Sequence, residues 1–187
     1  MAFIVVYDAN VLYLNTLRDL LIRIANQPHL VQAKWTDRIL DEMLDALQKN
    51  MPDISDEKAG RLRDLMNAAV RDCLVSGCEP LIDSLDLPDP DDRHVLAAAI
   101  KAGAQVIVTL NLKDFPAEKL APWNIKAKSP EDFVLDQIGI DRQAVGACVQ
   151  QIVDSRTQHP VTMDDVLNEL ARDGLVRAVT SLRAGGE

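Results

Sequence analysis

The stretch PDPDDRHVLAAAIKAGAQVIVTLNLKDFP, residues 88–116, decides the fold class of this chain. Asp89 is placed to cap a helix that has Pro90 in its first turn, and Gly103 is placed to end that helix. Residues 105–110 form a β-branched run that is typical of a strand buried on both faces. The stretch therefore predicts a helix followed by a buried parallel strand.

The acids of this stretch are expected to meet at one edge of a parallel sheet. Asp91 and Asp92 lie at the start of the helix, and Asp114 follows the carboxyl end of the strand. Ligands of open parallel sheets bind outside the carboxyl ends of the strands. The helix dipole alone also favours acids in a first helical turn, so a purely structural role stays open for Asp91 and Asp92.

A second unit of strand, acid and helix opens the chain. Residues 3–7 form an apolar run, Asp8 falls where this strand ends, and Asn10 follows two residues later. Residues 11–26 carry an apolar stripe that predicts a helix packed on the sheet. Because aspartate is depleted in strands, we interpret Asp8 as a functional residue.

A third group of acids lies on a helix that we predict over residues 37–49, with Thr36 as its N-cap. Asp41 and Glu42 flank its buried stripe on opposite sides, and Asp45 faces away from it. Periodicity does not choose between Asp41 and Glu42 as a site residue. A solvent-exposed face is the more common place for such acids.

The other elements complete an α/β domain over residues 1–138, followed by a helical extension over residues 139–187. In the domain we expect a helix over residues 56–73, a short edge strand over 77–82, a last strand over 123–128 and a helix over 130–136. In the extension we expect an amphipathic helix over residues 141–155, a second helix capped by Thr162 and ended by Gly174, and a disordered tail over 184–187.

Composition limits the classes of function. The formal net charge of −9 argues against broad attraction to nucleic acid, although it allows a local basic rim around an acidic metal site. Three cysteines without C-x-x-C spacing suit a reducing cytoplasm. We expect no signal peptide and no membrane span, because no apolar run has the required pattern or length.

The predicted topology brings distant carboxylates together. On a doubly wound sheet, Asp8, Asp92 and Asp114 all reach one edge. Several carboxylates share a site as anions only when their charge is compensated, and a hard divalent cation supplies that compensation. Mg²⁺ and Mn²⁺ prefer carboxylate and water oxygens and can activate a bound water toward phosphorus.

Four motifs over residues 3–135 together resemble the PIN-domain nucleases. In chain order they are VVYDANVL with Asp8, WTDRILDE with Glu42, DPDDRHVLAAAI with Asp92, and VTLNLKDF with Thr109, Asn111 and Asp114. The resemblance selects Glu42 over Asp41, and it favours Asp92 over the adjacent Asp91. It implies an α/β fold with a mostly parallel central sheet flanked by helices.

The resemblance also implies a metal-dependent endoribonuclease that uses Mg²⁺ or Mn²⁺. Its catalytic and metal-binding acids would be Asp8, Glu42, Asp92 and Asp114, with Asp91 as a further candidate ligand. The supporting residues that position the site or its waters would be Asn10, Thr109 and Asn111.

More narrowly, the chain resembles the VapC-type toxins of toxin–antitoxin pairs. That resemblance implies an RNA substrate, a small antitoxin partner, a homodimer and a cytoplasmic location. The shortest such toxins end near the last strand, so the extension of this chain departs from them.

Two other functions compete with the nuclease. A phosphatase of the haloacid dehalogenase class needs D-x-D after its first strand, whereas this chain has Asp8-Ala9-Asn10. A catalytically inert PIN-type module that binds protein or RNA need not keep the acids, and here all four positions are filled. The three histidines show no ligand spacing, and we assign surface or capping roles to them: His29, His94 and His159.

Overall fold

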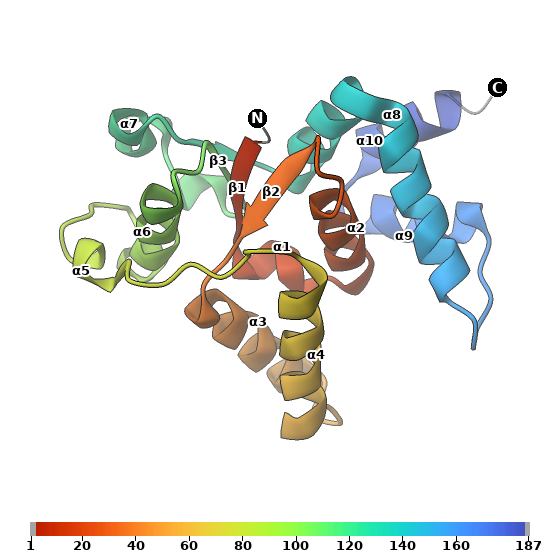
Figure 1. The fold of residues 1–187 in the computed structure, drawn as a ribbon, viewed down its shortest axis with the longest axis horizontal. Helices are drawn as coiled ribbons and strands as arrows, with labels where there is room; N and C mark the ends of the chain where they lie inside the picture. The colour runs from red at the N-terminus through yellow and green to blue at the C-terminus, as the bar shows by residue number, and fades with distance from the viewer. Residues whose placement is uncertain (1–2, 186–187) are drawn as a thin grey trace.

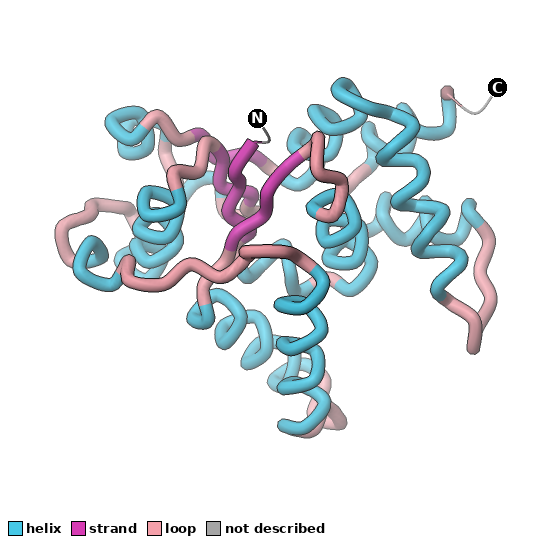
Figure 2. The backbone as a smooth tube through the Cα atoms, viewed as in Figure 1, coloured by secondary structure: helices cyan, strands magenta, loops and turns pink. Residues whose placement is uncertain are grey.

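The computed structural model of the protein describes residues 3–185 and is built around a four-stranded parallel sheet (Figures 1 and 2). The strands are β1 (Phe3–Tyr7), β2 (Val31–Lys34), β3 (Val106–Val108) and β4 (Lys126–Lys128), in the spatial order β2-β1-β3-β4. In the register of the sheet, Val5 pairs with Ala33 of β2 and with Val106 of β3. The predicted α/β class with a parallel central sheet is confirmed.

The helices are α1 (Ala9–Tyr13), α2 (Asn15–Ala25), α3 (Asp37–Asn50), α4 (Asp56–Ala69), α5 (Glu79–Ile82), α6 (Arg93–Ala102), α7 (Ala117–Leu120), α8 (Pro130–Ser155), α9 (Met163–Arg172) and α10 (Val176–Ala184). Three single 3₁₀ turns join them: η1 (Pro90–Asp92), η2 (Leu112–Asp114) and η3 (Ala121–Trp123). Figure 1 shows α6 and α2 on opposite sides of the sheet, α1 and α3 beyond the carboxyl ends of the strands, and α8 to α10 outside α2. Among residues 3–185, no helix is long and apolar enough to cross a membrane.

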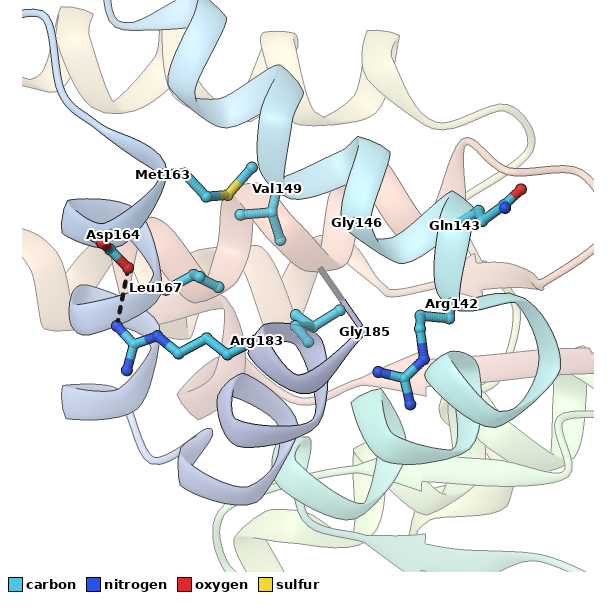
Figure 3. A pocket seen from close by; sticks show the side chains of 10 residues that line it. Arg142, Gln143, Gly146, Val149, Met163, Asp164, Leu167, Arg183 and Gly185 are labelled. Carbon is cyan, nitrogen blue, oxygen red and sulfur yellow. Dashed lines mark hydrogen bonds and ion pairs between the residues drawn. The ribbon is translucent and has the colours of Figure 1, made fainter. Parts of the chain in front are cut away.

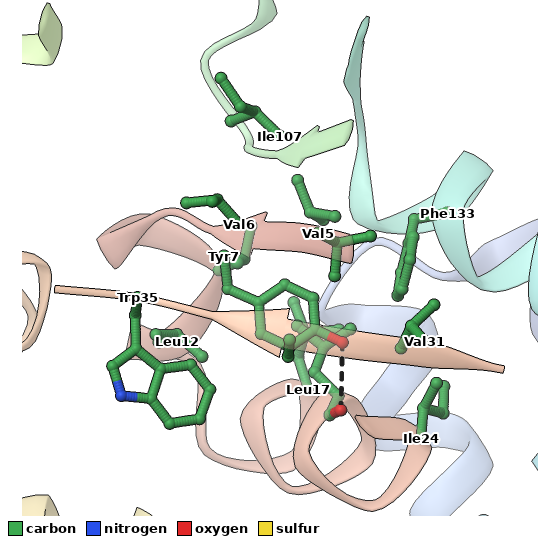
Figure 4. Packing of buried hydrophobic residues seen from close by; sticks show 14 of the residues in the cluster. Val5, Val6, Tyr7, Leu12, Leu17, Ile24, Val31, Trp35, Ile107 and Phe133 are labelled. Atoms are coloured by element: carbon green, nitrogen blue, oxygen red, sulfur yellow. Dashed lines mark hydrogen bonds between the residues drawn. The ribbon is translucent and has the colours of Figure 1, made fainter. Parts of the chain in front are cut away.

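The ring of Tyr7 joins the sheet to the helices on one of its faces (Figure 4). It is fully buried, lies edge-on to Phe133 of α8 with 5.8 Å between ring centroids, and stacks near Trp35 at 6.4 Å. Its hydroxyl donates to the carbonyl of Leu21 in α2 at 3.2 Å. Burial raises the pKa of Tyr7 well above its usual range, so the phenol stays neutral. One aromatic residue of β1 thereby fixes both α2 and α8 on the sheet.

The order of the strands reverses between β1 and β3. From β1 the chain passes through α1 and α2 to β2 on one side, then returns through α3 to α6 and adds β3 on the other side of β1. At such a switch point the two connections leave in opposite directions, and a crevice opens outside the carboxyl ends of the strands. Asp8 and Thr109 are the residues that follow β1 and β3 at this crevice.

The single helix that we predicted over residues 11–26 is wrong, because the chain breaks at Leu14 into α1 and α2. Leu14 has an extended backbone, with φ −75° and ψ 123°. The buried Arg18 donates from Nη1 to the carbonyl of Leu12 at 2.8 Å and to that of Tyr13 at 3.2 Å. The last carbonyls of α1 are thus satisfied by a side chain instead of by a continuing helix. We call this junction the α1–α2 elbow.

Three further expectations need correction. The strand β2 was not predicted; it is only four residues long and is fixed by its pairing with β1. The strand predicted over residues 77–82 is instead the short helix α5, whose first turn accommodates Pro80 because proline lacks an N–H. The helix predicted over residues 56–73 ends at Ala69.

The two helices predicted over residues 130–136 and 141–155 are both present in α8, which is divided by a kink at Asp141, where φ is −151° and ψ is 91°. The boundary that we placed between residues 138 and 139 lies inside α8, and the division into two parts stays a prediction. The capping box at Thr162 and Asp165 is confirmed. The helix α10 continues to Ala184, so disorder was wrongly expected there; residues 186 and 187 lie outside the described residues.

The extension packs against α2 through a polar network. Arg156 Nη1 donates to Glu169 Oε2 at 2.8 Å, and Arg156 Nη2 donates to Thr16 Oγ1 at 2.8 Å. Thr16 Oγ1 in turn donates to Glu169 Oε2 at 2.6 Å. The backbone N–H of Leu17 donates to Asp173 Oδ2 at 3.2 Å, which satisfies a donor in the first turn of α2. The elbow is therefore held partly by residues more than 130 positions away in the sequence.

This network makes Arg156 a test of how the extension contributes to stability. We expect Arg156→Met to lower the free energy of unfolding by about 1–3 kcal/mol, because it leaves Glu169 partly buried without its charged donor. Urea denaturation followed by circular dichroism measures the change. Arg71→Met is the matched control, since Arg71 is almost fully exposed and pairs only with its neighbour Asp72. Equal effects of the two substitutions would contradict a stabilising role of the network.

Candidate active site

The carboxylate of Asp8 lies at the centre of the crevice and is held by three donors. Asp8 caps α1 and is only 4% exposed. Its Oδ1 accepts from the N–H of Ala9 at 2.7 Å, and its Oδ2 accepts from Asn10 Nδ2 at 2.9 Å and Thr109 Oγ1 at 2.8 Å. Burial raises the pKa of Asp8, and the bonds from Thr109 and Ala9 oppose that rise. The acid is thus buried, oriented and only partly compensated.

Asn10 and Thr109 tie the end of β1 to the end of β3. Asn10 Nδ2 also reaches Thr109 Oγ1 at 3.2 Å, and Asn10 Oδ1 accepts from the N–H of Leu110 at 3.0 Å. Thr109 Oγ1 accepts from the N–H of Asn111 at 3.0 Å. The three supporting residues predicted from sequence therefore form one hydrogen-bonded chain around Asp8. The side chain of Asn111 itself is exposed.

Glu42 reaches the same crevice from α3 and meets a buried histidine. Its Oε1 lies 3.0 Å from Nε2 of His94 in the first turn of α6 and 3.3 Å from Nε of Arg38. The contact with His94 is an ion pair only when the imidazole is protonated, and its hydrogen-bond alignment is poor, since neither ring nitrogen has a well-directed partner. Burial would raise the pKa of Glu42, but His94 and Arg38 outweigh it and lower that pKa. Glu42 is therefore kept as an anion.

The surface or capping role that we assigned to His94 is wrong, because this residue is 2% exposed. Its position does contain a signal that could have revealed this. Residues 94–99 are all buried, so the small, apolar helix α6 is surrounded by protein on nearly every side. A histidine in its first turn is then buried with the rest.

Asp41 and Glu42 point to different neighbours, which sequence periodicity did not resolve. Asp41 is exposed and pairs with Arg63 of α4. Arg63 also lies 3.1 Å from Asp37, so it joins α4 to the outer face of α3. Glu42 instead faces α6 and the crevice through His94.

Asp92 and Asp114 bring further negative charge to the crevice. Asp92 is half-buried at the end of η1, and its pKa is raised to about 6 by burial and by the charges of Asp8, Asp89 and Asp114. Asp8 and Asp114 follow the carboxyl ends of the neighbouring strands β1 and β3, and Asp92 directly precedes α6. Asp91 is exposed, and its backbone N–H donates to the capping carboxylate of Asp89 at 2.9 Å.

The donor set fits a hard cation that keeps most of its water. Within residues 3–185, no three histidine, cysteine or carboxylate side chains are grouped so that they could hold a metal ion by themselves. Mg²⁺ binds through only one or two carboxylates, with waters and substrate phosphates as its other ligands. The buried carboxylate of Asp8 and the raised pKa of Asp92 indicate unbalanced negative charge here. A divalent cation would neutralise it.

A second hollow, of about 410 Å³, lies among α8, α9 and α10 (Figure 3). Its walls include the apolar side chains of Val149 and Leu167, and Arg183 reaches Asp164 across its rim at 3.4 Å. Its one acid, Asp164, is exposed and already paired. The hollow therefore lacks the buried, oriented acids that distinguish the crevice.

The comparisons with known proteins agree with this geometry. A family model described as PIN domain matches residues 4–113, and one described as VapC50 C-terminal domain matches residues 130–184. A curated relative from Mycobacterium tuberculosis (strain ATCC 25618 / H37Rv), named "Putative ribonuclease VapC50", is 47% identical over 79 residues. These residues are 42% of this chain and 47% of the relative, so the match spans about half the length of that relative. No solved structure matches the chain.

The PIN-domain match covers more than half of the chain and contains Asp8, Glu42 and Asp92. Asp114 lies one residue beyond its end. The match to the VapC50 C-terminal domain covers all of α8, α9 and α10. This chain therefore belongs to the PIN-domain family and carries a C-terminal part of the VapC50 type.

Proposed function

We propose that this protein is a metal-dependent endoribonuclease that hydrolyses RNA phosphodiesters with a metal-activated water. The observation that carries the proposal is the placement of Asp8, Asp92 and Asp114 at the switch point between β1 and β3, where burial and the charges of the neighbouring acids raise the pKa of Asp92 to about 6. Membership of the PIN-domain family supports it, as does a relative whose name describes a ribonuclease.

In this proposal the acids have distinct tasks. Asp8 and Asp92 hold Mg²⁺ or Mn²⁺, with Asp92 preferred over the exposed Asp91. Glu42 and Asp114 act from the rim, on the ion or on its waters. The bound ion lowers the pKa of a water and stabilises charge at phosphorus. Thr109 and Asn10 fix the Asp8 carboxylate in advance, so no reorientation is needed when substrate binds.

The structure also bears on the two competing functions. Asn10 occupies the position of the second acid of a D-x-D phosphatase motif, and its amide nitrogen donates to Asp8 at 2.9 Å. It therefore orients Asp8 instead of adding a charge to the site. A carboxylate that stays buried although burial raises its pKa, as Asp8 does, is more typical of a functional site than of an inert binding module. Both observations favour the nuclease.

The biological setting is proposed on the same basis. We infer that the protein is the toxin of a toxin–antitoxin pair, acts in the cytoplasm and is inhibited by a small antitoxin protein. The three buried cysteines are free thiols, as expected in a reducing compartment. That the protein forms a homodimer stays a prediction.

Substitution of the acids tests the proposed activity. Asp8→Asn, Glu42→Gln and Asp92→Asn should each lower the rate of RNA cleavage in Mg²⁺ or Mn²⁺ by about 100-fold or more, because each removes charge from the ion or its waters. Cleavage of a fluorescent RNA by the purified protein, with and without chelator, measures this.

Asp41→Asn and Asp45→Asn are the matched controls on α3, and we expect nearly unchanged cleavage because both acids are exposed. Cleavage that persists after exhaustive chelation would contradict the mechanism. Loss of activity in Asp41→Asn but not in Glu42→Gln would mean that the wrong face of α3 was assigned.

The raised pKa of Asp92 predicts a pH-dependent gain in stability when its charge is removed. The folded state holds a proton on Asp92 up to about pH 6, whereas the unfolded state loses it near pH 4, so this acid destabilises the metal-free protein increasingly between these values. At pH 7 Asp92→Asn should raise the free energy of unfolding by roughly 1 kcal/mol, a value reduced for solvent screening. At pH 4 the same substitution should raise the free energy of unfolding only a little.

Urea denaturation in chelator at both pH values measures this difference. Asp91→Asn is the control, because the neighbouring side chain is exposed and should show no such pH dependence. A gain of equal size at pH 4 and pH 7 would show that charge repulsion is not its cause.

A further inference from the structure

A groove of about 440 Å³ lies beside the proposed catalytic acids, between α1, α3 and the residues after β3. It shares Asn10 and Glu42 with the candidate active site, and Tyr13 and Leu110 line it as well. The groove therefore continues directly from the crevice. When a phosphate is held at the acids, the group attached to that phosphate lies next to the groove.

The lining of the groove suits an uncharged, flat group. Its walls are mainly apolar, Tyr13 contributes the one aromatic ring, and Glu42 is the only charged residue in it. No lysine or arginine lines it, so it is not built to hold phosphate. Asn50 also lines the groove, and its Nδ2 donates to the carbonyl of Ala46 at 2.8 Å, which leaves its Oδ1 as an acceptor.

Backbone groups of two residues that line the groove, Tyr13 and Leu110, are hydrogen-bonded before any ligand binds. The carbonyl of Tyr13 accepts from the buried Arg18 at 3.2 Å, within the α1–α2 elbow. The N–H of Leu110 donates to Asn10 Oδ1 at 3.0 Å, although the side chain of Leu110 is 48% exposed. The groove therefore presents an exposed leucine and an aromatic ring on backbone that is already fixed, which is a surface on which a flat group can stack.

We propose that this groove is a nucleobase subsite, in which the base of a nucleotide flanking the scissile phosphate stacks on Tyr13 and packs against Leu110. The inference rests on the proposed ribonuclease function. Aromatic stacking of a base is sequence-tolerant, because every base has a π-face. The Oδ1 acceptor of Asn50 adds a preference for bases that present an exocyclic amino group to it.

Short RNAs that lack one base provide the direct test. Each RNA carries an abasic nucleotide on one side of the scissile phosphate, and kcat/KM is compared with that of the intact RNA. For the wild type, removal of the base at one of the two positions should lower kcat/KM roughly 5- to 100-fold, the range expected for one stacked base.

Two variants of Tyr13 separate stacking from packing. Tyr13→Leu keeps apolar bulk without the ring. It should lower kcat/KM on intact RNA by a similar factor, and removal of the base should then lower kcat/KM no further. Tyr13→Phe keeps the ring and should therefore retain the difference in kcat/KM between intact and abasic RNA. Trp123→Leu is the matched control, because Trp123 is an exposed aromatic residue that does not line the groove.

Equilibrium binding of the same RNAs in chelator gives the comparison without cleavage, so it tests the subsite even if the protein proves not to be a nuclease. Wild-type protein that treats abasic and intact RNA alike in both assays would overturn the inference. So would a Tyr13→Leu variant that keeps normal RNA kinetics but loses affinity for a protein partner, since the groove would then be a protein-docking site.

Discussion

The hydrogen bonds that hold the Asp8 carboxylate are the constraint on which the rest of the structure depends. A buried carboxylate is costly unless donors surround it. Two of its donors, Ala9 and Asn10, follow β1, whereas Thr109 follows β3. The acid is therefore held only if β1 and β3 are neighbours whose carboxyl ends are level. That requirement explains why the crossover through α6, the burial of that helix and the sheet order all bear on the site.

The C-terminal helices have a structural connection to this site. Through Asp173 and the group formed by Arg156, Glu169 and Thr16, the extension fixes the start of α2. Arg18 of α2 holds the end of α1, the helix that carries Asn10 and begins at Asp8. The chain of contacts runs from α9 through the α1–α2 elbow to the proposed active edge. In this chain, the extension is therefore part of the framework behind the site.

Local patterns predicted much of this molecule, and non-local contacts account for what they missed. The β-branched strands, the caps at Thr36 and Thr162 and the stop at Gly103 are encoded within a few residues, and they are confirmed. The break at Leu14 is stabilised by Arg18 and also by the distant C-terminal extension, and the contact between His94 and Glu42 depends on partners distant in sequence. So does β2, which has too few residues to reveal itself without β1. The acids of the site were located by motif, whereas their coupling through Asp92 required the fold.

We propose that the carboxylates at the β1–β3 switch point form a divalent cation site. Anomalous X-ray diffraction from crystals grown with Mn²⁺ tests it most directly, because the signal places the ion without reference to activity. We predict one strong peak between the carboxylates of Asp8 and Asp92, completed by waters, and its absence from crystals of Asp8→Asn. A peak confined to the exposed acids of α3, or no peak at any acid of the crevice, would show that these carboxylates do not form a cation site.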